Sequence, residues 1–235
     1  MANQIISAAI LGLLPALIWL WFWLKEDRRH PEPRGLLALV FVVGAVAVIP
    51  AYLLEKGLYG YFPFDLGNQS WLIGGVLIWS AIEEILKFGA VYLVAFHNRS
   101  YDEPVDAMVY MITGAIGFAA LENSLFIWSA MQDGAMGGMS FLLTGNFRFL
   151  GATLVHIVSS ALVGGFIGLA FYGQAARKRL YLFWGLLTAV VLHAIFNYFI
   201  ISSDTGQILS IFFILWLVAV LVILFFEKVK HIYKK

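Results

Sequence analysis

The chain has 235 residues, of which 62% are hydrophobic and 12% are charged, and its mean hydropathy is +0.88. A soluble domain carries about 25% charged residues, so this composition excludes an ordinary water-soluble fold and predicts helices solvated by lipid. The net charge of +1 gives no basis for a nucleic-acid partner. The absence of cysteine excludes disulfides, thiol catalysis and cysteine-bound metal.

Seven apolar segments follow one another along the chain, and each has about the 20 residues needed to cross a bilayer as a helix. Short connections with glycine and proline separate them, and the brief alternating segments of a membrane β-barrel are absent. We therefore predict an all-α, polytopic membrane helix bundle that forms a single transmembrane domain over 1–235. The predicted spans are 4–24, 35–54, 71–95, 106–130, 147–172, 180–201 and 206–226.

Basic residues predict the orientation of these spans, because lysine and arginine are enriched in cytoplasmic loops. With the N-terminus outside and the C-terminus inside, 12 of the 15 lysines and arginines fall on the cytoplasmic side: Lys25, Arg28, Arg29, Arg34, Arg99, Arg177, Lys178, Arg179, Lys228, Lys230, Lys234 and Lys235. The opposite orientation would reverse this ratio. We therefore predict an N-out, C-in protein.

Polar and ionisable residues interrupt four consecutive predicted spans. A helix rises about 1.5 Å per residue, and this rise places the residues in one layer between the bilayer midplane and the outer surface. Ionisable groups inside a membrane are costly and mark functional sites by default. The layer contains Glu83, Glu122, Asn123, His156, His193 and Asn197.

Helical spacing adds to this pattern. Glu83 and Lys87 are four residues apart, as are His193 and Asn197, so each pair projects from one helix face. Taken singly, each has a structural explanation, since a Glu–Lys pair or a membrane asparagine can simply join helices. Taken together they indicate a functional centre. Small residues in the run TGAIGFAALEN and at Gly164, Gly165 and Gly168 would let the helices around such a centre approach closely.

Hydrolysis of a peptide bond fits these residue types. A carboxylate can act as general base on water, a histidine can move a proton, and an asparagine can stabilise an oxyanion. The catalytic candidates are Glu83, Glu84, Glu122, His156, His193 and Asn197, with Lys87, Asn123 and Asp106 in support. No HExxH zinc motif is present, so no metal or other cofactor is favoured. Zinc held by Glu83, Glu122, His156 and His193 stays open as an alternative.

Two other classes of function also stay open. The same residues could relay protons or bind a cation in a membrane carrier, although the internal repeats common in transporters are absent. A non-catalytic scaffold that sequesters a single-span partner is the third alternative. Asp106 lies at the inner mouth of its span, where capping of the helix N-terminus is the simpler role.

The motifs EEILK (83–87), the segment from Asp106 to GFAALEN (106–123), His156 and HAIFN (193–197) resemble the four polar motifs of the PrsW family. These are bacterial intramembrane proteases, distantly related to the CAAX prenyl proteases and the Abi group. The polar motif core spans 83–197. The resemblance implies an endopeptidase of the bacterial cytoplasmic membrane, in contact with the lipid bilayer. Its implied substrate is a single-span, anti-sigma-factor-like membrane protein cleaved on the extracytoplasmic side.

The resemblance also implies roles for the residues. Glu83 and Glu84 would activate water, with His156 and His193 completing the site, and the CAAX-type layout favours Glu83 as the base. Lys87 stands where the CAAX proteases have arginine, and prenylated substrates are not implied. The family has been described both as metalloprotease and as glutamic protease. We expect the glutamic type here, because the CAAX-type layout is metal-independent and no dedicated zinc motif appears.

Overall fold

The computed structural model describes residues 2–26, 31–62, 67–132, 139–202 and 206–233, with the side chains of Ala2, Glu26, 139–150 and Ile208 excepted. These residues form eight helices and no strand, which confirms the predicted all-α membrane bundle. The helices are α1 (Ala2–Glu26), α2 (Arg34–Val46), α3 (Val48–Leu58), α4 (Gln69–Val94), α5 (Asp106–Gln132), α6 (Met139–Leu169), α7 (Ala175–Ser202) and α8 (Ile208–Lys230).

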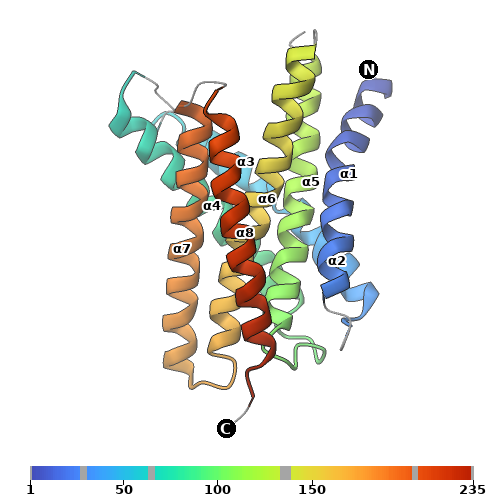
Figure 1. Cartoon of the computed structure of the whole chain (residues 1–235), viewed down its shortest axis with the longest axis vertical. Coiled ribbons are helices and arrows are strands. Elements are labelled where there is room, and N and C mark those ends of the chain that lie inside the picture. The colour runs from blue at the N-terminus through green and yellow to red at the C-terminus, as the bar shows by residue number, and fades with distance from the viewer. Residues whose placement is uncertain (1, 27–30, 63–66, 133–138, 203–205, 234–235) are drawn as a thin grey trace.

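The helices run alternately toward opposite ends of the bundle, with α2 and α3 together making one pass, and the two termini lie at opposite ends (Figure 1). Six helical segments of the described chain are long and apolar enough to cross a membrane. Helix α4, which contains Glu83, Glu84 and Lys87, is not among them. A count of seven spans therefore depends on α4 and stays a prediction.

The basic residues used to predict the orientation gather at one end of the bundle. Lys25 is in the last turn of α1, Arg34 begins α2, and Lys228 and Lys230 end α8, all at the end where the C-terminus lies (Figure 1). This grouping fits the predicted inward face, and the N-out orientation itself stays a prediction. Four of the residues lie outside the described part of the chain: Arg28, Arg29, Lys234 and Lys235.

The second predicted span, 35–54, is not one continuous helix. Helix α2 ends at Val46 and α3 begins at Val48, with a break at Ala47. The physical reason is Pro50, which has no N–H to donate to the carbonyl of Val46 and whose ring crowds that carbonyl. The two helices together cover Arg34–Leu58, so the span continues for a further turn beyond the predicted end.

Helix α5 forms the centre of the bundle, and its residues are buried continuously from Asp106 to Ala120. Its glycines let neighbouring backbones come close: a Cβ atom at Gly117 would lie 2.0 Å from the carbonyl oxygen of Phe41 in α2. Across the other interface, a Cβ atom at Gly164 of α6 would lie 2.5 Å from the carbonyl oxygen of Ala107. The prediction that small residues permit close helix approach is confirmed at these contacts.

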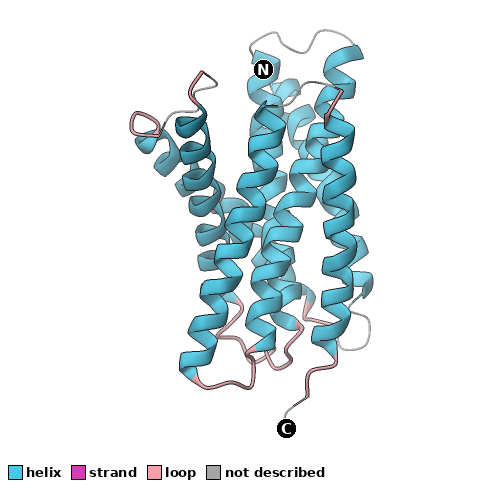
Figure 2. Cartoon of the chain, turned by 60° about the vertical axis from the view of Figure 1, so that its left-hand side comes forward, coloured by secondary structure: helices cyan, strands magenta, loops and turns pink. Residues whose placement is uncertain are grey.

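Large apolar side chains cover much of the outside of the bundle, on α8 most clearly. Phe213, Leu217 and Leu221 are all more than half exposed, as expected for side chains solvated by lipid and not by water. At the end that holds the N-terminus, the α3–α4 pair leans away from the other helices, which stay together as a column (Figure 2). This arrangement leaves the polar residues of α4 facing the column from one side.

Candidate active site

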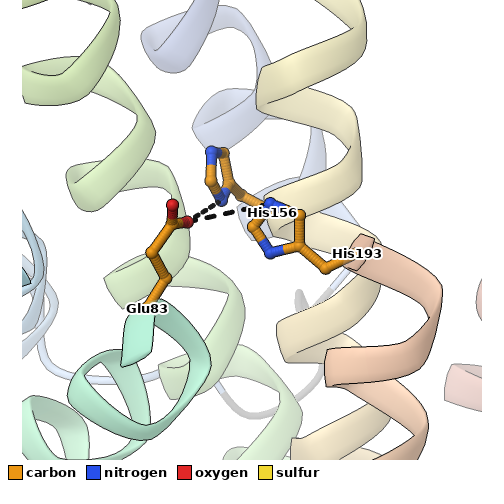
Figure 3. A group of neighbouring side chains, drawn as sticks. All are labelled: Glu83, His156 and His193. Carbon is orange, nitrogen blue, oxygen red and sulfur yellow. Dashed lines mark ion pairs between the residues drawn. The ribbon is translucent and has the colours of Figure 1, made fainter. Parts of the chain in front are cut away.

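Four helices bring the predicted polar residues together inside the bundle. Glu83 and Glu84 come from α4, Glu122 from α5, His156 from α6 and His193 from α7. Figure 3 shows the side chains of Glu83, His156 and His193 pointing toward one another from three of these helices. We call Glu83, Glu84, Lys87, Glu122, His156 and His193 the cavity cluster.

Glu84 has partners on both carboxylate oxygens and no exposure to the surroundings. Its Oε1 lies 2.6 Å from Lys87 Nζ and 2.9 Å from His193 Nδ1, and its Oε2 accepts a hydrogen bond of 3.2 Å from Ser160 Oγ. A carboxylate that accepts from an ammonium, an imidazole and a hydroxyl is held in one position and has little capacity left to accept a proton from water. Glu84 is therefore placed to orient Lys87 and His193.

The contacts of the two histidines fix which ring nitrogen bears the hydrogen. Lys87 Nζ lies 2.9 Å from His156 Nδ1, and because an ammonium only donates, Nδ1 must accept. His156 Nε2 then bears the hydrogen and meets Glu122 Oε2 at 2.7 Å. On His193 the hydrogen belongs to Nδ1, which donates to Glu84, so Nε2 presents a lone pair toward Glu83.

Glu83 differs from Glu84 in having an oxygen without a hydrogen bond. Its side chain is 9% exposed, and Oε2 is buried and makes no hydrogen bond within the described chain. The nearest donors or lone pairs around Oε2 are 3.7 Å away on His156 Nδ1, 3.7 Å on His193 Nε2 and 4.0 Å on Lys87 Nζ. These separations are too long for direct hydrogen bonds.

A cavity of about 180 Å³ lies beside Glu83 and is lined by residues of α4 to α7. Its polar floor contains Glu83, Glu122, Asn123, His156, His193 and Asn197, whereas Glu84 and Lys87 do not reach it. Above this floor the wall is apolar, with Trp79, Phe126 and Ile200. Trp79 is four residues before Glu83, Phe126 is four after Glu122, and Ile200 is seven after His193. Because α4 runs away from the end that holds the N-terminus while α5 and α7 run toward it (Figure 1), all three lie on that side of these polar residues.

The remaining candidates from the sequence have different positions. Asn197 lines the cavity one turn beyond His193. Asn123 also lines it and donates a 2.9 Å hydrogen bond to Thr153 Oγ1 of α6, so it joins α5 to α6 at the edge of the site.

Asp106 lies far from the cavity, 16 residues before Glu122 on the same helix and about 24 Å away along its axis. It accepts hydrogen bonds from the backbone N–H groups of Asp102 and Glu103, so it holds the loop that precedes α5.

Sequence reasoning missed three contributors to this site. Ser160 is one turn after His156 and donates to Glu84, a spacing that could have indicated a common face. Thr153 holds Asn123, and nothing in its sequence context indicated that role. Glu55, near the end of α3, has a buried Oε1, and its position just after the predicted span 35–54 gave no signal of a role at the site.

The ligand atoms of Glu83, His156 and His193 lie within 4.8 Å of one another and could hold a metal ion. Two histidines and a glutamate are a known ligand set of catalytic zinc sites. Ligand atoms of tetrahedral zinc are about 3.4 Å apart, so the 3.7 Å separations from Glu83 would need to shorten by a few tenths of an ångström. Glu122, the fourth ligand of the zinc alternative, contacts His156 and is not in this group of three.

The helical membrane fold and this arrangement define a class of protein: a polytopic membrane protein whose buried carboxylates and imidazoles meet at a cavity within the bundle. The chain belongs to the PrsW family, because residues 32–225 match the family described as PrsW family intramembrane metalloprotease. The resemblance seen in the polar motifs is thereby confirmed. Membership in a protease family supports the predicted hydrolase over the carrier and the scaffold.

Curated relatives carry the description Protease PrsW. The relative from Clostridioides difficile (strain 630) is 26% identical over 212 residues, covering 88% of this chain and 86% of the relative. That from Bacillus subtilis (strain 168) is 26% identical over 218 residues, 90% of each chain. That from Shouchella clausii (strain KSM-K16) is 24% identical over 221 residues, 92% of this chain and 94% of the relative. No solved structure matches the chain.

Proposed function

We propose that this intramembrane protease cleaves its substrate with a water molecule activated by Glu83. The observation that carries the proposal is the position of Glu83 Oε2, which lies at the cavity, buried and without a hydrogen bond, while Glu84 beside it is fully engaged. Two adjacent glutamates thus have separate roles. Glu84 orients its neighbours, and Glu83 is free to accept a proton, which is what a general base requires.

The proposed reaction uses each group once. Glu83 takes a proton from water as the water oxygen forms a bond to the carbonyl carbon of the scissile peptide. The oxyanion that develops is stabilised by the side-chain amide of Asn197, in the polar floor of the cavity one turn beyond His193. The carbon–nitrogen bond then breaks as the amine leaves with a proton returned by Glu83, and the carboxylic acid product gives its remaining proton to solvent. His193 Nε2 can accept a hydrogen bond from the attacking water and so orient it.

The contacts of His156 favour this metal-free mechanism. Nδ1 of His156 accepts a hydrogen bond from Lys87, and Nε2 then bears the hydrogen, so neither nitrogen offers a lone pair to a metal in this arrangement. Coordination through Nδ1 would require Lys87 to leave it and a dication to sit near an ammonium group. His156 instead is suited to hold Glu122 and Lys87 in position at the border of the cavity.

A metal-dependent mechanism is the second candidate, and the convergence of Glu83, His156 and His193 favours it. The hydrogen bond from His193 Nδ1 to Glu84 also resembles the carboxylate–histidine pairs that orient zinc ligands. If zinc is bound, Glu83, His156 and His193 would hold it, and the ion would activate water and polarise the carbonyl group. Lys87 would then pair with Glu84 alone.

For the substrate we propose a single-span, anti-sigma-factor-like membrane protein, cleaved on the outer side of the bacterial cytoplasmic membrane. Two observations support this. The cavity extends from the polar floor toward the end of the bundle that holds the N-terminus, which the basic residues predict to be outside (Figure 1). The relatives named Protease PrsW come from bacteria.

The test is cleavage of a single-span reporter by the purified protein in liposomes. We expect Glu83→Gln to lower the rate by about 10³-fold, since a general base contributes about 10²–10⁴-fold. Glu227→Gln, at the exposed inner end of α8, is the matched control and should cleave at the wild-type rate. Cleavage by Glu83→Gln within a few fold of wild type would refute Glu83 as the base.

The two candidate mechanisms differ in metal content. The metal-free mechanism predicts less than about 0.1 zinc ion per active protein molecule and full activity after chelation. A catalytic zinc site would instead give about one zinc ion per molecule. Stoichiometric zinc that is lost together with activity in Glu83→Gln and His193→Ala would establish the metal-dependent mechanism instead. Metal content of the folded variants is measured independently of activity, which separates loss of zinc from loss of the base.

A further inference from the structure

We propose that Glu55 of α3 is a positioning residue of this site, which acts through Glu122 to keep the Glu122–His156 contact in place. The inference deepens the proposed function and rests on it. Glu55 is not among the residues that line the cavity, and none of the polar motifs includes it. Three observations lead to it: the register of α3, the contacts of the residue on which α3 packs, and an unpartnered carboxylate oxygen.

The register of α3 places Glu55 on the buried face of the helix. Val48 and Ala51 are buried and pack with Phe118 of α5. Glu55 is seven residues after Val48 and four after Ala51, so it continues the same face by one turn. The opposite face of α3, with Tyr52 and Leu53, is more than half exposed.

Phe118 links this face to the site. Its ring lies 5.5 Å from the ring of His156 and 4.9 Å from Lys87 Nζ. Helices α3 and α5 run toward the same end of the bundle (Figure 1), and Glu122 is one turn beyond Phe118 just as Glu55 is one turn beyond Ala51. Glu55 and Glu122 therefore lie at about the same level, one on each side of the α3–α5 contact.

The carboxyl group of Glu55 is directed inward. Its Oε1 is buried and makes no hydrogen bond within the described chain. Its register on α3 places it at the level of Glu122, across the contact that Val48 and Ala51 make with Phe118. A glutamate at the lipid-exposed edge of a bundle could extend toward the headgroups, so a half-buried glutamate with one fully buried oxygen is a costly arrangement.

The effect on Glu122 follows from like-charge repulsion. The side chain of Glu122 is 41% exposed and lines the cavity, and no hydrogen bond within the described chain holds its Oε2. When Glu55 and Glu122 are both ionised, the charge on the α3 side repels the Glu122 carboxylate toward α6, where His156 Nε2 meets it at 2.7 Å. With Nε2 held in this way, Nδ1 stays turned toward Lys87, as the observed geometry requires.

The experiment compares charge with shape at position 55. Glu55→Gln keeps the shape and removes the charge, and we expect kcat on the reporter to fall about tenfold with KM unchanged, the scale of a lost supporting contact. Glu55→Asp keeps the charge and should retain most of the activity. Lys56→Met, at the adjacent exposed position of α3, is the control for removing a charge from this helix.

A double-mutant cycle tests whether Glu55 acts through Glu122. Glu55→Gln with Glu122→Gln should be no slower than Glu122→Gln alone, since the second change removes the group on which the first one acts. Losses that multiply, or wild-type kcat in Glu55→Gln, would overturn the inference. Equal losses in Glu55→Asp and Glu55→Gln with a lower melting temperature would also overturn it, in favour of a role in folding. Unimpaired cleavage by Glu83→Gln would instead refute the proposed function itself.

Discussion

Two groups of buried acidic residues lie at different levels of this bundle, and they are built differently. The cavity cluster contains Glu83, whose Oε2 makes no hydrogen bond within the described chain. The second group, which we call the loop cluster, is Glu32, Asp106 and Tyr110, at the other end of α5. There Tyr110 donates a hydrogen bond to Glu32, and Asp106 accepts two from the backbone.

The comparison shows that burial of a carboxylate does not by itself indicate chemistry. Glu32 and Asp106 are as buried as Glu83, yet their contacts tie the segments before α2 and α5 to the bundle and border no cavity that we describe. Glu83 faces a cavity and keeps an oxygen available. Satisfied hydrogen bonds stabilise a structure, whereas an unsatisfied, accessible oxygen is what a reaction with water requires.

The sharpest test of this difference is Lys87→Met. It removes the only lysine that contacts Glu84 in the described chain and leaves a fully buried carboxylate without its cation. Breaking a buried ion pair costs about 3–5 kcal/mol, so we expect a large loss in the free energy of unfolding, measured by thermal or detergent-induced unfolding. Glu83→Gln should cost far less, since Glu83 makes no hydrogen bond through Oε2. Equal losses in the two variants would remove the distinction between Glu83 and Glu84.

Asp106→Asn, in the loop cluster, should lower the stability of the protein without lowering the rate of cleavage. It weakens two hydrogen bonds that the carboxylate accepts from the N–H groups of Asp102 and Glu103. Hydrogen bonds to a charged group contribute about 1.5–3 kcal/mol, and we expect a loss toward the lower end because the amide oxygen still accepts. The reporter should be cleaved at the wild-type rate by the folded fraction. A loss of kcat at unchanged stability would place Asp106 in the catalytic mechanism.

Asn123→Ala should have the smallest effect of the three. It removes the 2.9 Å hydrogen bond to Thr153 between α5 and α6, and such bonds between membrane helices average about 0.6 kcal/mol. Thr153→Val should cost a similar amount and serves as the matched variant from the other helix. If Asn123→Ala abolishes cleavage while Thr153→Val does not, Asn123 acts on the substrate and belongs with the cavity cluster.

Composition and residue spacing were enough to predict the membrane fold and to name most residues of the candidate site. Composition requires lipid as solvent, and segment length then requires helices, because backbone groups in a bilayer must satisfy one another within the helix. Counting residues along the predicted spans was enough to place Glu83, Glu122, His156 and His193 at one level, since the rise of a helix is fixed. The structure brings all four together.

The contacts that distinguish Glu83 from Glu84 could not be predicted from residue spacing. Spacing of four residues suggested that Lys87 pairs with Glu83, but Lys87 lies 2.6 Å from Glu84 and 4.0 Å from Glu83. Side-chain direction in three dimensions depends on helix rotation and on partners from other helices, here His193 and Ser160. Glu55 likewise shows its buried Oε1 only in the folded bundle, where α3 packs on α5. The spacing of residues along a helix does not give the rotation of that helix about its axis within the bundle. This rotation places Glu83 beside the cavity and Glu84 among its hydrogen-bond partners.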